Sequence, residues 1–183
     1  MVPVVDRPDR RRLVLEVAHQ ALRQQDYQRI QMKEVAAAAQ MALGTIYEQF
    51  SSKDHLYAAV LLQWGALDRD VPGRRSQISA PERVRADVED MITAYERWPY
   101  LYRLYPALQG TGDRNAQALL AEFAAVPLRW LAGDLRMVDP GTAEDGAMML
   151  WSLLAGRLSL VQDGDLGEVR RLSARLLDLL LDR

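Results

Sequence analysis

Residues 31–55 constrain the fold of this chain more than any other segment, because they contain two short helical patterns joined by a tight turn. Val35 and Ala39 lie four positions apart and give the first pattern one apolar face. Ile46 and Phe50 do the same for the second pattern. A short helix whose outward face is polar is what a helix-turn-helix places in the major groove of DNA. The segment therefore predicts a helical domain that binds double-stranded DNA.

The same segment resembles the DNA-binding module of the TetR family of transcriptional regulators, which are dimeric repressors released by small ligands. The matches stand at fixed spacing: Glu34, Val35, Ala36, Ala39, Gly44, Thr45, Ile46, Tyr47, Phe50 and Lys53. The resemblance implies an all-α fold of about nine helices. It also implies an N-terminal three-helix DNA-binding bundle over residues 1–55, and a helical domain for ligand binding and dimerisation over residues 56–183.

Five positions depart from the family pattern, and the mildest departure is Met41, which replaces an apolar turn valine. Gln31 stands where a hydroxyl residue usually caps the second helix, and Ala42 replaces the serine that usually caps the third, a loss of about 0.5–2 kcal/mol. Gln40 replaces the turn glycine, where a positive φ costs other residues roughly 1 kcal/mol. Gln49 replaces the common phosphate-binding tyrosine or histidine and is itself a phosphate candidate. These departures leave the operator and the affinity open.

The predicted DNA contacts come from the arginine-rich start of the chain and from the helix-turn-helix. Leu43, Gly44 and Thr45 are expected nearest the bases, since leucine can touch a thymine methyl and glycine permits close approach. Tyr47 and Lys53 are expected on phosphates, although Tyr47 as a core-edge aromatic and Lys53 as a solvated lysine remain alternatives. A solvated helix start is the alternative for the arginines. The complete set is Arg10, Arg11, Arg12, Gln31, Met32, Ala42, Leu43, Gly44, Thr45, Tyr47, Gln49 and Lys53.

Bulk properties fit a soluble regulator. The chain has 183 residues, enough for one or two domains, and its 49% apolar and 26% charged content is ordinary for a globular protein. The net charge is −2, yet residues 1–53 carry a small excess of basic residues. No apolar stretch reaches the roughly 18 residues of a membrane span, and no signal peptide is visible, so we expect no membrane contact and a cytoplasmic location.

Enzyme and metal sites find no support in the pattern. His19 and His55 are the only histidines, and they fall on different predicted helices without the spacing of a metal motif. The chain has no cysteine, no nucleophile elbow and no phosphate-binding loop. We expect no catalytic residue, metal or cofactor.

Start and stop signals divide the chain into helices. A capping box is expected at Ser51 with Asp54, and further helix starts are expected at Ser79 with Glu82, Thr142 with Asp145, and Asp165 with Glu168. Residues 71–79 are expected to connect two helices, and Pro106 to interrupt residues 100–108. The first helix is expected to bury Leu13, Val17, Ala18 and Leu22. The predicted helices are 9–24, 32–39, 43–49, 51–67, 79–98, 100–108, 113–136, 142–162 and one from 165.

Aromatic residues and methionines gather around helices broken by Pro99, Pro106 and Pro127, which favours a ligand cavity, since small-molecule sites are mostly apolar. For each residue, plain core is the alternative. The pocket candidates are Trp64, Met91, Tyr95, Trp98, Tyr102, Tyr105, Phe123, Trp130, Met148 and Trp151. Residues 42–56 also resemble the subgroup controlling cholesterol and fatty-acid breakdown, which implies steroid or acyl thioesters of coenzyme A. Phosphates would then meet Arg97, Arg103 and Arg129, unless these are solvated.

The last two helices carry a predicted dimer interface. A strip of small residues at spacings of three and four lets helix backbones approach closely, and the last helix is apolar around most of its circumference. Such a helix is covered on two sides, and a second protomer is one cover that forms a four-helix interface. Burial within its own domain is the alternative. The interface candidates are Ser152, Ala155, Gly156, Ser159, Leu172, Leu176 and Leu179.

These patterns together predict a homodimeric transcriptional regulator. It would repress from a near-palindromic operator in double-stranded DNA and leave it when a small hydrophobic effector binds. The alternative is a helical small-molecule or protein-binding module whose degenerate helix-turn-helix does not regulate transcription.

Overall fold

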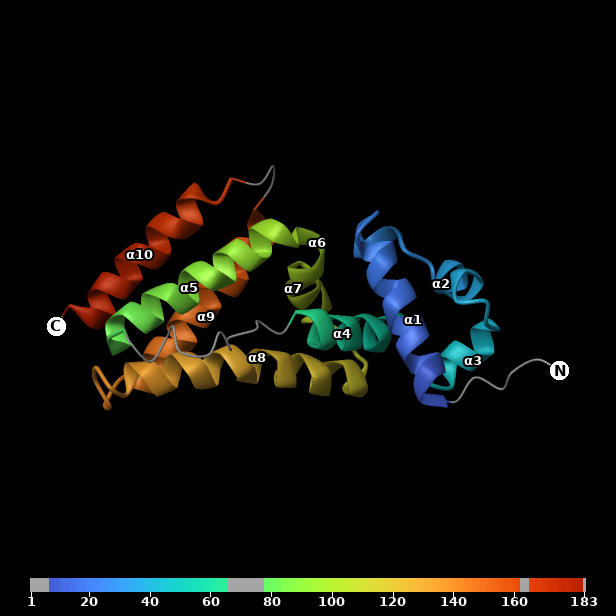
Figure 1. Cartoon of the computed structure of the whole chain (residues 1–183), viewed down its shortest axis with the longest axis horizontal. Helices are drawn as coiled ribbons and strands as arrows, with labels where there is room; N and C mark the ends of the chain where they lie inside the picture. The colour runs from blue at the N-terminus through green and yellow to red at the C-terminus, as the bar shows by residue number, and fades with distance from the viewer. Residues whose placement is uncertain (1–6, 66–77, 162–164, 183) are drawn as a thin grey trace. The chain divides into compact units, whose positions relative to one another are not determined.

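The computed structural model describes residues 7–65, 78–161 and 165–182, and every regular element in these ranges is helical (Figure 1). The elements are α1 (Arg7–Leu22), the 3-10 turn η1 (Tyr27–Arg29), α2 (Met32–Ala38), α3 (Leu43–Tyr47), α4 (Lys53–Trp64), α5 (Ala80–Arg97), α6 (Pro99–Tyr102), α7 (Leu104–Leu108), α8 (Arg114–Leu135), α9 (Ala143–Leu160) and α10 (Gly167–Leu181). The all-α prediction is confirmed.

The short helices α6 and α7 correct the predicted position of one break. The chain breaks at Arg103, not at Pro106, because Pro106 lies in the first turn of α7, where a residue without an N–H is tolerated. Residues 99–108 are therefore two helices rather than one interrupted helix. The predicted connection over residues 71–79 lies mostly outside the described residues.

Two of the predicted helix starts are confirmed together with their side-chain caps. At α5, the Ser79 hydroxyl accepts from the Glu82 N–H and the Glu82 carboxylate accepts from the Ser79 N–H at 2.8 Å, so the capping box is complete. At α8, Asp113 Oδ1 accepts from the N–H groups of Asn115 at 2.8 Å and Ala116 at 3.3 Å. In both cases the capping residue and its partners are near neighbours in the sequence.

The predicted capping box of α4 is wrong, because the cap is Ser52, not Ser51, and its hydroxyl accepts from the His55 N–H at 3.0 Å. Thr142 is the N-cap residue of α9, as predicted, although its hydroxyl donates backwards to Asp139 at 2.7 Å instead of capping the helix. At α10, Asp165 accepts from the Gly167 N–H at 2.9 Å instead of capping through Glu168, which pairs with Arg157.

The chain packs as two compact units. The described part of unit 1 is residues 7–65 and 100–122, and that of unit 2 is residues 78–99 and 123–161 with 165–182. The predicted domain boundary after residue 55 lies inside α4, all of which packs in unit 1. Helix α8 supplies residues 114–122 to unit 1 and the rest to unit 2.

Unit 1 is built on α4, which packs against α1 and α7, while α2 packs against α1 and α3. The predicted inward face of α1 is partly wrong, because Leu13 is 39% exposed and Val17 is half-buried. The buried residues Val14, Ala18 and Leu22 repeat every four positions, so the inward face is rotated from the predicted one. Large side chains that are fully buried in this unit are Leu22, Ile30, Ile46, Phe50, Leu56, Tyr57, Leu61, Leu104 and Leu108.

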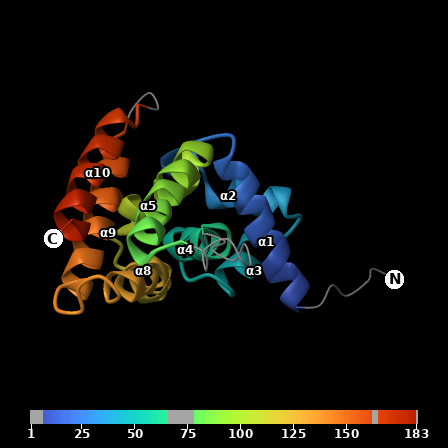
Figure 2. The ribbon, with the colours of Figure 1, turned by 60° about the vertical axis from the view of Figure 1, so that its left-hand side comes forward.

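In unit 2, α5, α9 and α10 each pack against the other two (Figures 1 and 2). Its core includes Val84, Ile92, Leu131, Leu150, Leu154 and Leu177. The prediction that α10 is apolar around most of its circumference is wrong. The helix buries one face and exposes charged residues, among them Arg171, Arg175 and Asp178, on the other.

Candidate nucleic-acid interface

The turn between α2 and α3 is a Schellman turn with glutamine in the left-handed position. Gln40 has a φ of 54°, as the sequence predicts for this turn. The Met41 N–H donates to the Ala36 carbonyl at 3.0 Å and the Gln40 N–H donates to the Ala37 carbonyl at 3.1 Å. These bonds satisfy the last carbonyls of α2, so the turn keeps its geometry without glycine.

Helix α3 is short and is held mainly by what lies beneath it. It has five residues and begins after Ala42, which offers no side-chain cap. Its inward anchors are Ile46 and, just beyond its end, Phe50, both fully buried. Since an isolated helix of this length is unstable in water, α3 depends on these tertiary contacts.

The outward face of α3 is accessible. Tyr47 is 45% exposed and Leu43 is 39% exposed, while Thr45 is half-buried. A methyl group added at Gly44 would meet no atom of the protein within 4 Å. The residues expected nearest the bases therefore form an open surface above two buried anchors, and the exposed Gln31 and Ala42 lie at the starts of α2 and α3.

The arginines at the start of α1 have different surroundings. The Arg11 guanidinium lies over the Phe50 ring, 4.4 Å from its centroid, and Nη1 donates to the Gln49 carbonyl at 3.4 Å. Arg12 pairs with Glu16 at 3.0 Å on the exposed side of the helix. Arg10 is half-buried. Arg11 is thus engaged with the chain after α3, whereas Arg12 is engaged within α1.

Among the other predicted DNA contacts, Met32 is contradicted: it is only 7% exposed, so it is a core residue. Gln49 is half-buried, and its side-chain oxygen is buried without a hydrogen-bond partner among the described residues. A phosphate would accept from its side-chain nitrogen, so this contact stays a prediction. Lys53 donates through Nζ to the Tyr27 carbonyl at 2.6 Å and lies 4.1 Å from the Tyr27 ring centroid; burial lowers the pKa of this lysine. One of the three donors of its ammonium is thus engaged within the protein, and the phosphate contact stays a prediction.

A hydrogen-bond cluster at the start of α4 was not predicted. Asp113 accepts from the hydroxyls of Ser51 at 2.6 Å and Ser52 at 2.5 Å, and these bonds hold the pKa of Asp113 at about 2. Asp54 accepts from Thr111 at 2.5 Å and from the Tyr27 hydroxyl, so the pKa of Tyr27 rises through burial and then this bond. The partners come from the α7–α8 loop and from η1, and local sequence signals do not join residues so far apart.

His55 lies beside this cluster. Its Nδ1 accepts from the Ser51 N–H at 3.1 Å, and its ring meets the Phe50 ring edge-on at 5.4 Å between centroids. Burial lowers the pKa of His55, Asp113 raises it in part, and Arg11 lowers it further. The neutral imidazole is the form that accepts the Ser51 bond.

The predicted pocket residues are divided between the two units: Trp64, Tyr102 and Tyr105 belong to unit 1 and the rest to unit 2. In unit 1, Trp64 stacks on His19 at 4.6 Å, and the Tyr102 hydroxyl donates to the Gly65 carbonyl at 3.3 Å; burial raises the pKa of Tyr102 to about 12. In unit 2, Met91 and Tyr95 are buried, Trp98 and Trp130 are half-buried, and Phe123 contacts Trp151 edge-on at 6.0 Å. Met148 is 51% exposed, so its assignment to an enclosed pocket is wrong.

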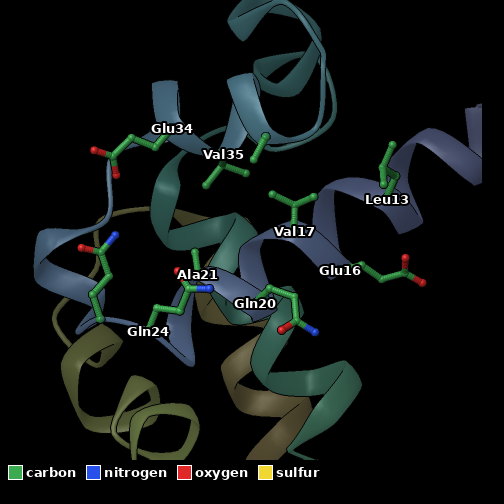
Figure 3. Close-up of a pocket in the computed structure, with 10 residues that line it drawn as sticks. Leu13, Glu16, Val17, Gln20, Ala21, Gln24, Glu34 and Val35 are labelled. Carbon is green, nitrogen blue, oxygen red and sulfur yellow. The ribbon is translucent and has the colours of Figure 1, made fainter.

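A hollow of about 660 Å³ lies elsewhere, between α1 and α2 (Figure 3). Its apolar floor includes Leu13, Val17 and Val35, and its polar rim includes Glu16 and Glu34. None of the predicted pocket residues lines it.

The predicted dimer residues lie on α9 and α10 of unit 2. Ser152 and Gly156 are exposed, whereas Ala155, Ser159, Leu172 and Leu176 are half-buried. Leu179 is 65% exposed, and α9 adds exposed Met148, Met149 and Leu160, which the sequence interpretation did not place at this surface.

The described ranges contain no group of three or more histidine, cysteine, aspartate or glutamate side chains placed to hold a metal ion. No helix of the described chain is long and apolar enough to span a bilayer.

Comparison with known proteins gives a match for the first domain. Residues 14–60, from α1 through most of α4, match the family model for bacterial regulatory proteins of the tetR family. None of the curated proteins matches the chain.

Solved structures resemble the chain over nearly its whole length. A TetR transcriptional regulator from Rhodococcus sp. RHA1 is 21% identical with a TM-score of 0.67, covering 95% of each chain. The regulator FadR from Bacillus subtilis, solved with stearoyl-CoA, is 15% identical with a TM-score of 0.66, covering 93% of this chain and 97% of its own. AibR, solved with isovaleryl coenzyme A and operator DNA, is 19% identical with a TM-score of 0.62, covering 94% and 98%. The likeness extends the shared fold beyond the first domain.

Proposed function

Residues 14–60 make this chain a member of the tetR family of bacterial regulatory proteins, and on that premise we propose that it is a ligand-responsive transcriptional repressor. It binds double-stranded operator DNA through α3 and leaves it when a small hydrophobic effector binds. The observation that carries the proposal is the open outer face of α3 above the buried anchors Ile46 and Phe50. No observation favours the alternative of a helical module without a regulatory role.

The proposed contacts sort into two kinds. Leu43, Gly44 and Thr45 meet base edges, because they lie at the start of α3, where a recognition helix enters the major groove. Tyr47 meets a phosphate, since its exposed ring carries a hydroxyl and lies at the other end of the same helix. Base contacts set the preferred sequence, and phosphate contacts set affinity for any duplex.

A homodimer is part of the proposal, because a near-palindromic operator needs two reading helices. The exposed apolar residues Met148, Met149, Leu160 and Leu179 support α9 and α10 as the interface. Gly156 adds an exposed position without side-chain bulk, where a second helix can approach closely.

An acyl thioester of coenzyme A is the effector class we propose. Two of the structural neighbours, FadR and AibR, are solved with such thioesters. The aromatic and methionine residues of unit 2, among them Met91, Tyr95 and Phe123, provide apolar surface of the kind an acyl chain contacts.

The test begins with selection of the preferred duplex from a random pool by the wild-type protein, followed by affinity measurements on it. Gly44→Ala adds one methyl that meets no protein atom, so the fold is kept while the approach to DNA is blocked. We expect affinity for the selected duplex to fall at least about tenfold, a loss of one good contact. Gly133→Ala in α8 is the matched control, because its added methyl is equally unobstructed, and it should leave DNA affinity unchanged.

The same complex tests the other parts of the proposal. Sedimentation should give an even number of protomers per duplex, and stearoyl-CoA or isovaleryl-CoA, but not free coenzyme A, should release the DNA. Absence of duplex binding by the wild type even at low ionic strength would remove the regulator proposal altogether.

A further inference from the structure

We infer that Arg11 is a positioning residue for DNA reading: its guanidinium fixes the C-terminal end of α3 to α1, and it does not bind a phosphate. The inference rests on the proposed function for its consequence, because α3 is the helix that reads DNA. The anchoring itself is a property of the free protein.

The first observation is the double contact of one side chain. Nη1 of Arg11 donates to the carbonyl of Gln49 at 3.4 Å, and the guanidinium carbon lies 4.4 Å from the centroid of the fully buried Phe50 ring. A cation over a ring face is attracted by its quadrupole. A carbonyl just past a helix end has no partner within the helix, and an arginine there satisfies it. Both contacts hold the guanidinium against the chain that leaves α3.

The second observation is the support on the other side of the same connection. His55 meets the Phe50 ring edge-on at 5.4 Å, and its Nδ1 accepts from the Ser51 N–H at 3.1 Å. Residues 49–51 are therefore held by α1 through Arg11 and by α4 through His55. The connection is fixed at both ends of a three-residue segment.

The third observation is the weakness of α3 by itself. Five residues and no side-chain cap give the helix little stability of its own. Its start is joined to α2 by the Schellman turn, so its far end is the part that needs an anchor. A small shift there would move Tyr47 and Gly44 relative to the bases, and contacts of this kind are lost with displacements of about 1 Å.

Arg12 provides the matched control on the neighbouring position. It has the same charge, lies on the same helix, and forms an exposed ion pair with Glu16 instead of a contact to α3. An exposed pair of this kind contributes little to stability. Substitution of Arg12 therefore reports the effect of removing one positive charge without removing the anchor.

Amide hydrogen exchange of the DNA-free protein tests the anchor. In Arg11→Ala we expect exchange at residues 46–50 to become at least about tenfold faster, while amides at the centre of α4, such as Ala59, keep their rates. Arg12→Ala should leave both groups unchanged. If Arg11→Ala does not fold, Arg11→Met keeps most of the side-chain volume and takes its place. Unchanged exchange at residues 46–50, or equal acceleration throughout unit 1, would overturn the inference.

DNA binding tests the reading role. In Arg11→Ala we expect affinity for the selected duplex to fall at least tenfold, affinity for an unrelated duplex of the same length to change less than twofold, and the salt dependence on the unrelated duplex to stay the same. A phosphate contact predicts the opposite. Affinity would then fall on both duplexes, and the slope of log affinity against log salt concentration would be lower in magnitude by about 0.9. That result would replace positioning with phosphate binding. If the wild type binds no duplex, the proposed function fails, and hydrogen exchange still decides whether Arg11 anchors α3.

Discussion

Helices α5 and α3 are fixed in this protein in two different ways. α5 has 18 residues, a complete capping box at Ser79, and a stripe of buried residues along its length. α3 has five residues and no side-chain cap, and its position depends on contacts from α1 and from the residues beneath it. A long helix carries its own boundaries, whereas a short reading helix takes its position from the tertiary structure.

The junction that follows α3 shows the same dependence. Ser51 and Ser52 bond to Asp113, and Asp54 bonds to Thr111, across sequence separations of 57 to 62 residues. Ser79 and Glu82 are three residues apart. We expect a change at the junction to act on several helices at once, and a change at Ser79 to act on α5 alone.

The largest effect is expected for Asp113→Ala. The change removes the acceptor of two serine hydroxyls and the N-cap of α8, a loss of about 2 kcal/mol, so thermal denaturation should show a melting temperature lower by roughly 4–8 °C. Hydrogen exchange should become faster at the starts of both α4 and α8. Asp113→Asn keeps a capping oxygen and should lose less. If exchange becomes faster only at the start of α8, the junction does not depend on Asp113.

A smaller effect is expected for Ser79→Ala. Loss of the capping box costs about 1 kcal/mol and lowers the melting temperature by roughly 2–4 °C. Faster exchange should be limited to the first turn of α5. If the faster exchange extends into unit 1, α5 is not fixed by its own cap alone, and the contrast with α3 does not hold.

Gln40→Gly is expected to stabilise the protein by a similar or slightly smaller amount. Glycine adopts the φ of 54° without the strain of a side chain, a gain of about 0.5–1 kcal/mol after its own entropy cost. The melting temperature should rise, and the affinity for DNA should not fall. A decrease in melting temperature would mean that the Gln40 side chain contributes more than the turn strain costs.

The smallest effect is expected from pH. The pKa of His55 is lowered in the folded protein, mainly by burial, so folding favours the neutral ring. This stability is present above the unfolded pKa of about 6.5 and is lost as the pH falls through that value towards the folded pKa. Because the pKa of Asp113 is about 2, the stability that depends on ionised Asp113 is lost at a lower pH than the stability that depends on neutral His55.

Melting temperatures between pH 7.5 and 5.5 provide the measurement. His19 also has a lowered pKa, so the comparison uses His55→Gln, in which the decrease should be smaller than in the wild type. An equal decrease in both proteins would assign the effect to His19.

The sequence alone determined the features that depend on neighbouring residues. It determined the helix-turn-helix from the four-residue spacing of Val35 with Ala39 and Ile46 with Phe50, and the start of α5 at Ser79, whereas the left-handed turn at Gln40 followed from the family resemblance. Spacing and caps are local, because hydrogen bonds within a helix or turn join residues at most a few positions apart. The all-helical fold follows from the same signals.

Only the tertiary structure shows what surrounds the candidate DNA-binding residues. Met32 is buried, the Lys53 ammonium donates to the Tyr27 carbonyl, and the Arg11 guanidinium lies over the Phe50 ring. The sequence likewise could not choose Ser52 over Ser51 as the cap of α4, since Asp113 engages both serines from the far side of the junction. The physical reason is that burial and long-range hydrogen bonds depend on packing between distant segments, which no local pattern encodes.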